Sequence, residues 1–132
     1  MFNALEISSS ALTAQRVRMD TIAQNVANIN VTRNARGERA PYQRRFAVFL
    51  EGRGPDGARP GVRAIVRRDP SFRPVLDPSH PDAGPDGYVK YPNIDLAIEF
   101  VNALEASRAY EANVTAMEVT KAMVNASLRL LA

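Results

Sequence analysis

Glycine and proline are confined to the middle of this 132-residue chain. All nine prolines and all seven glycines lie between Gly37 and Pro92, so residues 1–36 and 93–132 contain neither. Both residue types interrupt helices, proline because it lacks a backbone donor and glycine because of its conformational entropy. The distribution therefore predicts a helix at each end of the chain and a different kind of structure between them.

We divide the chain accordingly into an N-terminal helix over residues 1–32, an insert over 33–92 and a C-terminal helix over 93–132. The predicted fold class is mainly α. The two long helices are expected to pack as an antiparallel, coiled-coil-like pair, and the insert is expected to be a small β or irregular segment rich in proline and glycine. The three segments are expected to form one structural unit.

The N-terminal segment, from about Phe2 to Ile29, has the seven-residue spacing of a helix that packs along one seam. One seam position is apolar throughout and the other only in its later half, and together they contribute Leu5, Leu12, Met19, Ile22, Val26 and Ile29. Residues 8–10 are serines, which weaken the first turns because serine competes for backbone hydrogen bonds. We expect this end of the helix to be marginally stable in an isolated subunit.

The C-terminal segment has a stronger repeat. Its first seam position is apolar six times in succession, at Leu96, Ala103, Tyr110, Met117, Val124 and Leu131. A second series, four residues later, includes Phe100, Val114 and Leu128. Asn93 and Asp95 follow Pro92, and both are residue types that cap helix N-termini.

Pairing the two seams leaves apolar residues on other faces of the helices, for example Ile98, Val101 and Leu104 on the second helix. Residual apolar faces of this kind commonly mark association with further helices. From the pattern alone two interpretations are open: a self-contained helical hairpin with a mobile insert, and a subunit that associates with others through its helices.

Within the insert, residues 42–50 and 61–67 are typical of β-strands, and the turn-rich residues 51–60 between them predict a hairpin. Residues 69–87 hold five prolines and two glycines, which predicts an extended loop. Residues 87–91 are predicted to be a short strand that precedes the second helix.

Residues suited to catalysis are scarce. The chain has no cysteine and one histidine, His80, which excludes thiolate nucleophiles and multi-histidine metal sites. Asp77, Asp82 and Asp86 lie near His80 in the sequence, but their spacing matches no calcium-binding loop. We therefore predict no enzymatic activity, no cofactor, no metal site and no small-molecule substrate.

Positive charge is concentrated in residues 33–91, which hold twelve basic and seven acidic side chains. Two arginine pairs, Arg44–Arg45 and Arg67–Arg68, lie near aromatic residues, a combination found both in single-stranded nucleic-acid sites and in protein contacts. We favour protein contacts and expect no nucleic-acid partner. The alternative function is a helical-hairpin binding or adaptor protein that uses this basic insert, for instance on nucleic acid.

No stretch of the sequence approaches the roughly 20 consecutive apolar residues of a membrane span, so we do not expect a membrane-embedded protein. The first 15 residues lack the basic and continuous apolar regions of a cleavable signal peptide. If the protein leaves the cytoplasm, it is expected to use another export route.

Two terminal motifs resemble those of a known family. Residues 10–20 (SALTAQRVRMD) lead into Asn25-Val26-Ala27-Asn28, and residues 107–113 read SRAYEAN. Both resemble signatures of the flagellar basal-body rod protein family, a Leu-x-Ala-Gln stretch before Asn-[aliphatic]-Ala-Asn and a Ser-Arg-x-Tyr-[Glu/Gln]-x-Asn stretch. The motif residues are Asn25, Asn28, Ser107, Arg108, Tyr110 and Asn113. Residues 77–82 (DPSHPD) and 87–96 (GYVKYPNIDL) are similar to those of the short proximal-rod proteins in that family.

The resemblance implies a structural, torque-transmitting subunit of the proximal rod of the bacterial flagellum, in the periplasm. It implies export through the flagellar type III apparatus without cleavage of a signal peptide. The implied partners are other rod and basal-body proteins, copies of the chain itself and the export apparatus. We predict that the terminal helices form the assembly interface through Leu5, Leu12, Met19, Ile22, Val26, Ile29, Leu96, Phe100, Leu104, Tyr110, Val114, Met117, Val124, Leu128 and Leu131.

Overall fold

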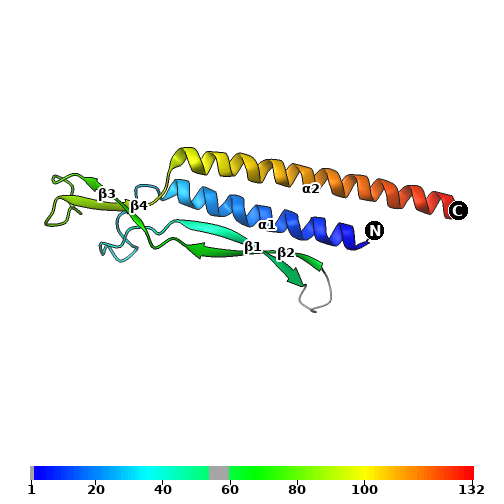
Figure 1. Ribbon diagram of the computed structural model, residues 1–132, viewed down its shortest axis with the longest axis horizontal. Helices are drawn as coiled ribbons and strands as arrows, with labels where there is room; N and C mark the ends of the chain where they lie inside the picture. Colours follow the sequence, from blue (N-terminus) through cyan, green and yellow to red (C-terminus); the bar gives the residue numbers. More distant parts are fainter. Residues whose placement is uncertain (1, 54–59) are drawn as a thin grey trace. The chain divides into compact units, whose positions relative to one another are not determined.

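The computed structural model describes residues 2–53 and 60–132. This part of the chain contains two helices and four strands (Figure 1): α1 (Phe2–Ala27), β1 (Arg45–Arg53), β2 (Pro60–Arg68), β3 (Phe72–Leu76), β4 (Tyr88–Pro92) and α2 (Leu96–Leu131). Strand β1 pairs with β2, and β3 pairs with β4, so the described strands form two separate two-stranded sheets.

The internal contacts of the chain define two units. Unit 1 comprises Met1–Met19, Ala47–Ile65 and Ala103–Ala132, and unit 2 comprises Asp20–Phe46 and Val66–Asn102. Each unit therefore draws on both terminal helices and on the insert.

The terminal helices form where glycine and proline are absent. Helix α1 has 26 residues and α2 has 36, so they measure about 39 and 54 Å at 1.5 Å per residue. The predicted N-cap role of Asp95 is confirmed, because its Oδ1 accepts a hydrogen bond of 2.9 Å from the Ala97 N–H. The side chain of Asn93, the other candidate, instead donates to Ser71 Oγ at 3.0 Å.

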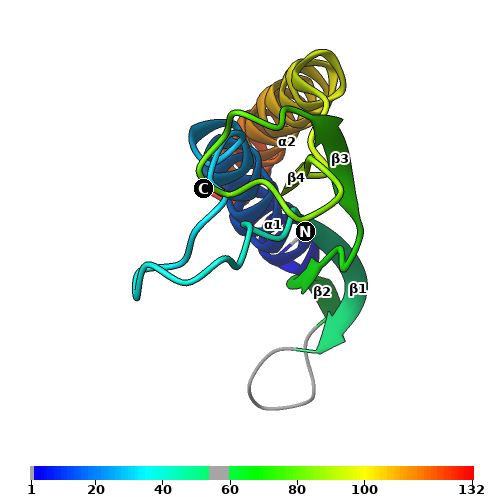
Figure 2. The same ribbon diagram turned by 90° about the vertical axis from the view of Figure 1, so that its left-hand side faces the viewer.

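Unit 1 consists of three layers, with α1 between α2 and the β1–β2 hairpin (Figures 1 and 2). The helices run antiparallel here, and Arg18 of α1 pairs with Glu105 of α2 at 3.1 Å. Both side chains of this ion pair are partly exposed, so it stabilises the pairing by at most about 1 kcal/mol. Ala14 and Ala106 are the buried apolar residues in the described part of this unit, and their small side chains allow close helix packing.

One serine of the N-terminal run attaches α1 to the hairpin. Ser10 Oγ donates to the Ile7 carbonyl at 2.7 Å and accepts from the Val62 N–H of β2 at 2.9 Å. The β2 backbone lies close to the Ser10 side chain here, since a Cβ added to Gly61 would lie only 3.0 Å from Ser10 Oγ. The serine that weakens the helix locally therefore satisfies a backbone donor of the neighbouring strand.

Unit 2 contains the antiparallel β3–β4 sheet and most of the buried apolar side chains. The strand register places Val75 opposite Val89 and Pro74 opposite Lys90. Val89 is fully buried, and Ile94, in the segment that leads into α2, is nearly so. Ile22 of α1 is another buried apolar side chain of this unit.

The prediction of a mainly α fold with only a small insert is wrong. The hairpin predicted over residues 42–50 and 61–67 is present as β1 and β2, but the loop predicted over 69–87 contains strand β3 with Pro74 within it. Proline is tolerated there because every strand of a two-stranded sheet is an edge strand. The turn predicted over 51–60 falls largely on residues 54–59, which lie outside the described part of the chain.

The predicted coiled-coil-like packing of the two seams is also wrong. The middle of the first α2 series is half-buried, but its ends, Leu96 and Leu131, are 42% and 85% exposed. A straight helix drifts by about 20° per heptad against a strict seven-residue repeat, so a seam of this length cannot stay on one face. The accompanying buried positions come three residues after the first series, at Glu99 and Ala106, and not four residues after it.

We predict that Ser10→Ala lowers the free energy of unfolding by about 1 kcal/mol, because the Val62 N–H loses its acceptor. Ser9→Ala is the matched control, since Ser9 is exposed and adjacent in the same helix; it is expected to change stability by less than about 0.5 kcal/mol. Urea unfolding followed by circular dichroism measures both values. Equal effects of the two substitutions would contradict the role assigned to Ser10.

Candidate functional site

The side-chain amide of Asn25 makes the two hydrogen bonds to the first residue of β1 that a neighbouring strand would otherwise make. Its Nδ2 donates to the Arg45 carbonyl at 2.6 Å, and its Oδ1 accepts from the Arg45 N–H at 2.9 Å. A side-chain amide offers a donor and an acceptor in this arrangement, whereas an ionised aspartate offers acceptors alone and cannot replace it. Asn25 is 1% exposed, and its two hydrogen bonds fix the end of α1 against the start of β1.

Glu99 of α2 completes the same buried cluster. It is 1% exposed, its Oε1 accepts from Arg44 Nε at 2.7 Å, and its Oε2 lies 3.4 Å from Asn25 Nδ2. A buried carboxylate is costly without a partner, and Arg44 supplies the compensating charge. We call Asn25, Arg44 and Glu99 the Asn25 cluster; within unit 2 it joins α1, the residue before β1, and α2.

Aromatic and cationic groups surround the Asn25 cluster. The Tyr42 hydroxyl lies 3.4 Å from Asn25 Oδ1, and the Arg45 guanidinium lies 5.6 Å from the centre of the Tyr42 ring. Burial raises the pKa of the Tyr42 phenol above its usual value, although the positive charges of Arg45 and Arg68 act in the opposite direction. The phenol therefore stays protonated at neutral pH and can donate to Asn25.

Of the remaining family-motif residues, Asn28 lies in unit 2 and the others lie in unit 1. Asn28 Nδ2 donates to the Gln24 carbonyl at 2.7 Å, just beyond the end of α1. In unit 1 the Ser107 hydroxyl lies 4.0 Å from Met19 Sδ, and Asn113 Nδ2 donates to the Ala109 carbonyl within α2. The other two motif residues are Arg108, which is exposed, and Tyr110, which is half-buried.

The residues predicted for assembly divide into two groups by burial. Those at least half-buried within the chain are Leu5, Leu12, Met19, Ile22, Val26, Ile29, Tyr110, Val114, Met117 and Val124. Those exposed on the surface are Leu96, Phe100, Leu104, Leu128 and Leu131. Only the second group, all on α2, is available to a neighbouring molecule without rearrangement of the fold.

The acidic residues near His80 make local contacts. Asp82 pairs with Arg33 at 2.5 Å and accepts from the Thr32 hydroxyl at 2.7 Å, and these partners hold the pKa of its carboxyl below the usual value. Asp77 accepts from the Ser79 hydroxyl. Among the residues that the structure describes, no group of three or more His, Cys, Asp or Glu is placed to hold a metal ion.

Two of the four arginines in the predicted basic pairs are engaged inside unit 2. Arg44 binds Glu99, and Arg45 stacks on Tyr42 and lies 3.3 Å from Gln24 Oε1. The second pair, Arg67–Arg68 of β2, is exposed. The basic insert therefore offers fewer surface cations than its sequence indicates.

Sequence reasoning did not identify Glu99, Arg44 or Ser10 as structural residues. The pattern marks Glu99 only as an acid near the start of a helix and Arg44 as part of a basic pair. One signal could have indicated that Glu99 is buried: it lies three residues after Leu96, and in a heptad repeat a residue at that spacing shares the packed face of the helix.

Neither described helix is long and apolar enough to span a membrane.

Comparison with known proteins defines the class of protein. A sequence profile described as flagella basal body rod protein matches residues 5–36, and one described as flagellar basal body rod FlgEFG protein C-terminal matches residues 86–130. The first match contains Asn25, and the second contains Glu99. The fold and the site therefore belong to a structural protein of the flagellar basal-body rod, a class that is not enzymatic.

Full-length relatives identify the family. The chain is 40% identical to the flagellar basal-body rod protein FlgC of Bacillus subtilis, with 98% of this chain and 97% of the relative aligned. It is 36% identical to FlgC of Borreliella burgdorferi (99% and 97% aligned) and 36% identical to FlgC of Escherichia coli O157:H7 (98% and 97% aligned). The chain belongs to the FlgC family of flagellar basal-body rod proteins. This membership supports the rod function and not the adaptor alternative.

We predict that Asn25→Ala lowers the free energy of unfolding by about 2–3 kcal/mol, because the N–H and carbonyl of Arg45 lose their buried partner. Asn28→Ala is the matched control, and a loss below about 1 kcal/mol is expected there because Asn28 is half-exposed. Urea unfolding measures both. A larger loss for Asn28 would refute the role given to Asn25.

We also predict that Arg44→Met destabilises the chain by about 3 kcal/mol, because it leaves the Glu99 carboxylate buried without its cation. The double variant Arg44→Met/Glu99→Met should recover most of this loss, since a buried ion pair can often be replaced by apolar side chains. Thermal unfolding of the single and double variants tests this coupling. Additive losses in the double variant would show that the two residues act separately.

Proposed function

We propose that this rod subunit assembles with its neighbours through the exposed apolar side chains of α2. Ten of the large apolar side chains that are exposed in the described residues lie on this helix. Soluble monomeric proteins rarely leave extended apolar patches in water. This accumulation on one helix is the observation that carries the proposal.

In unit 1, the exposed side chains of Leu104 and Val119 point away from the face of α2 that buries Ala106, and Met123 is exposed as well. Leu104 is 60% exposed. In unit 2, Phe100 and Val101 are likewise more than half exposed. Covering one such side chain contributes roughly 1.5–3 kcal/mol, so a few of them suffice for a stable contact.

The proposed occupants of these surfaces are other basal-body rod proteins and further copies of the chain. The buried residues of the predicted interface, such as Tyr110 and Met117, act in this proposal by holding α2 in place and not by direct contact. Membership of the FlgC family supports rod partners as a class, and the exposed apolar residues of α2 supply the surface.

Family membership supports the finer parts of the proposal. The subunit is exported through the flagellar type III apparatus without cleavage of a signal peptide, and it joins the rod in the periplasm. There it transmits torque, which requires stiffness. Two antiparallel helices that bury small side chains, such as Ala14 and Ala106, supply stiffness in this proposal, because well-packed interiors deform little.

We predict that Leu104→Asp abolishes rod assembly and swimming while the purified chain remains folded, because the substitution places a charge in a contact that must lose its water. An exposed position should change the free energy of unfolding by less than about 0.5 kcal/mol. Ala35→Asp introduces the same charge at an exposed residue outside the helices and strands and should leave swimming unchanged.

Swimming halos and isolation of basal bodies score assembly, and circular dichroism scores folding. Normal swimming by cells that carry only the Leu104→Asp subunit would rule out this surface of α2 as an assembly contact.

A further inference from the structure

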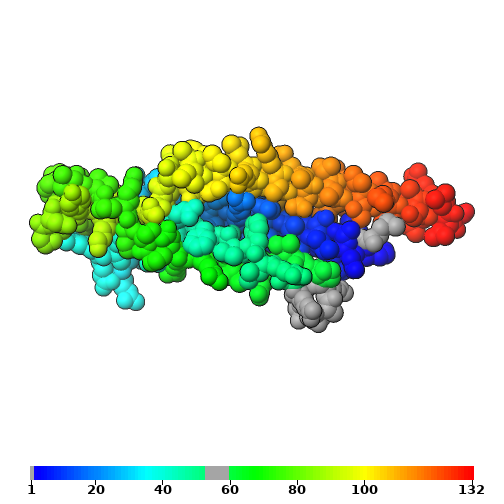
Figure 3. Space-filling view, viewed as in Figure 1, coloured from blue at the N-terminus to red at the C-terminus, as the bar shows by residue number. Residues whose placement is uncertain are grey.

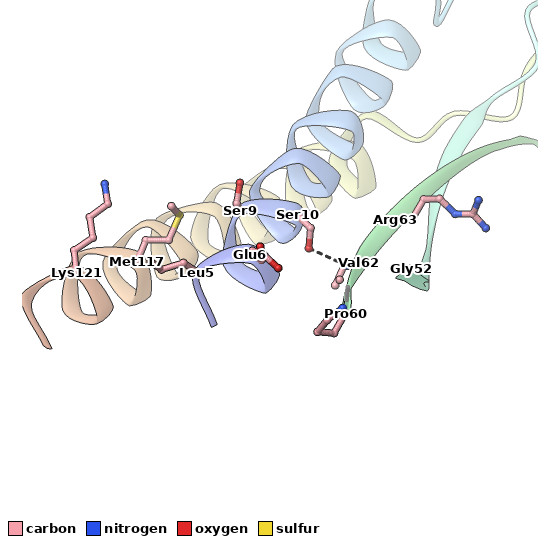
Figure 4. A pocket seen from close by; sticks show the side chains of 11 residues that line it. Leu5, Glu6, Ser9, Ser10, Gly52, Pro60, Val62, Arg63, Met117 and Lys121 are labelled. Carbon is pink, nitrogen blue, oxygen red and sulfur yellow. Dashed lines mark hydrogen bonds between the residues drawn. The ribbon is translucent and has the colours of Figure 1, made fainter. Parts of the chain in front are cut away.

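Charge distinguishes two grooves of the described chain. The groove of unit 1 shown in Figure 4 has a volume of about 610 Å³, and one acidic and two basic side chains line it. A groove of about 460 Å³ in unit 2 is lined by Arg33, Arg45 and Arg68 and by no acidic side chain of the described residues. Only the groove of unit 2 therefore selects a ligand by charge, and we call it the arginine groove.

The loop formed by residues 31–42 supplies one wall of the arginine groove. The Tyr42 N–H donates to the Val31 carbonyl at 3.1 Å, which closes the base of this loop. Within it, Asn34 Oδ1 accepts from two backbone N–H groups at 2.9 and 3.0 Å. Figure 3 shows part of the loop, in cyan, projecting from the surface. A wall that is already held by hydrogen bonds loses little conformational freedom when a ligand binds.

Apolar side chains line the arginine groove beside the guanidinium groups. Phe72 of β3, Val31 and Pro41 are each half-buried, so part of their apolar surface is accessible. Covering this surface stabilises a complex in proportion to the area removed from water. A matching ligand therefore offers an apolar group next to a negative charge.

Two of the three arginines have no acidic partner. Arg33 forms an ion pair with Asp82. Arg45 instead lies 3.3 Å from the neutral Gln24 Oε1, and Arg68 is exposed. Neither Arg45 nor Arg68 forms an ion pair with any residue that the structure describes. Two positive charges in the groove are thus left without a counter-charge.

Acidic side chains that are close to the groove in the sequence have other partners. Asp69 Oδ1 accepts from the Ser71 N–H at 2.9 Å, and Glu38 Oε2 accepts from Asn34 Nδ2 at 2.9 Å. Glu99 is buried with a different arginine. The chain therefore does not neutralise its own arginine groove through these carboxylates.

The two uncompensated arginines lie on either side of one aromatic residue in their electrostatic effect. Burial raises the pKa of the Tyr42 phenol, and the positive charges of Arg45 and Arg68 both oppose this rise. Both guanidinium groups are therefore near Tyr42. A guanidinium has several N–H donors in one plane, and it commonly binds a carboxylate through two of them.

We propose that Arg45 and Arg68 bind a carboxylate side chain in an acidic peptide segment of a partner protein. An apolar side chain next to that carboxylate packs on Phe72 and Pro41. Arginine and tyrosine are both enriched in protein interfaces, and the charge of the groove supplies the selectivity for an acidic segment.

The arginine groove suits a peptide better than a nucleic acid. Single-stranded nucleic acids stack their bases on free aromatic faces, but the Arg45 guanidinium lies over the Tyr42 ring, 5.6 Å from its centre. Binding to a nucleic-acid backbone also uses a series of phosphate contacts. Two uncompensated cations beside an apolar wall match one carboxylate and its apolar neighbour.

This inference goes beyond the assembly surface proposed for α2. The arginine groove is formed by the insert and by the residue Val31 that precedes it, and none of the described residues of α2 lines it. The α2 contact and the arginine groove can therefore fail independently of each other.

Selection from a random peptide library tests the proposal. The full chain is immobilised and exposed to phage that display random linear peptides, and the retained peptides are sequenced. The same selection is made with Arg68→Glu and with Arg67→Glu. Arg67 is the matched control, because it is the exposed neighbour of Arg68 on β2 and does not line the groove. Both substitutions change the net charge by the same amount, and circular dichroism checks that each variant folds.

We expect the wild-type chain and Arg67→Glu to retain a set of peptides that Arg68→Glu does not retain. In this set an acidic residue should stand next to an apolar one. A fluorescein-labelled peptide with the consensus sequence should bind Arg68→Glu roughly tenfold or more weakly by fluorescence anisotropy, because a charged hydrogen bond is replaced by repulsion. Replacing its acidic residue by the corresponding amide should weaken binding similarly.

Three results would overturn the inference. The first is that no peptide set depends on residue 68, or that the dependent set lacks acidic residues. The second is that Arg67→Glu and Arg68→Glu weaken binding equally, which would indicate general attraction by a basic surface. The third is that single-stranded oligothymidylate binds the chain and Arg68→Glu abolishes this binding, which would assign the groove to nucleic acid.

The Leu104→Asp chain separates this inference from the proposed function. Leu104 does not line the arginine groove, so this variant should bind the consensus peptide as the wild-type chain does. Loss of peptide binding in Leu104→Asp would contradict the assignment of the peptide to the arginine groove, whatever the variant does to swimming.

Discussion

The hydrogen bonds between the Asn25 amide and the backbone of Arg45 are the constraint on which unit 2 depends. They join α1 to β1, which among the described strands pairs with β2 alone. Glu99 then adds the second helix, and Arg44 neutralises it. Buried polar groups tolerate few alternative arrangements, because each misplacement leaves a donor or acceptor unpaired. The Asn25 cluster therefore favours the observed arrangement of three segments that are distant in the sequence.

Unit 1 is held by weaker interactions. Its contacts include one partly exposed ion pair, Arg18–Glu105, and one serine hydrogen bond to β2, and the buried apolar side chains in its described part are alanines. Small residues bury little apolar area, so they contribute little stability of their own. Several larger apolar side chains of α2 in this unit are exposed. These exposed side chains are the surface on which the proposed assembly contact rests.

Sequence reasoning succeeded where the signal is local. The absence of glycine and proline located both helices to within a few residues, and Asp95 marked the start of α2. It failed where the structure depends on contacts between distant segments. Pro74 suggested a loop, but proline is tolerated in an edge strand, and the sequence around Pro74 does not reveal that β3 is an edge strand. Only the position of Arg44 explains why Glu99 is buried. A strict seven-residue repeat also hides the drift of a straight helix, so the predicted seam of α2 does not stay on one face and its ends, Leu96 and Leu131, are exposed.

The sequence by itself determined which segments are helical, because backbone preferences of glycine and proline are local, and it indicated the family, because each of the two motifs is contiguous. Tertiary structure alone decided which face of α2 is buried, which charges are paired and which apolar residues remain in water. These depend on contacts between residues that are far apart in the sequence, such as Asn25 with Arg45, 20 positions away, and with Glu99, 74 positions away. No local pattern contains the distance between their side chains.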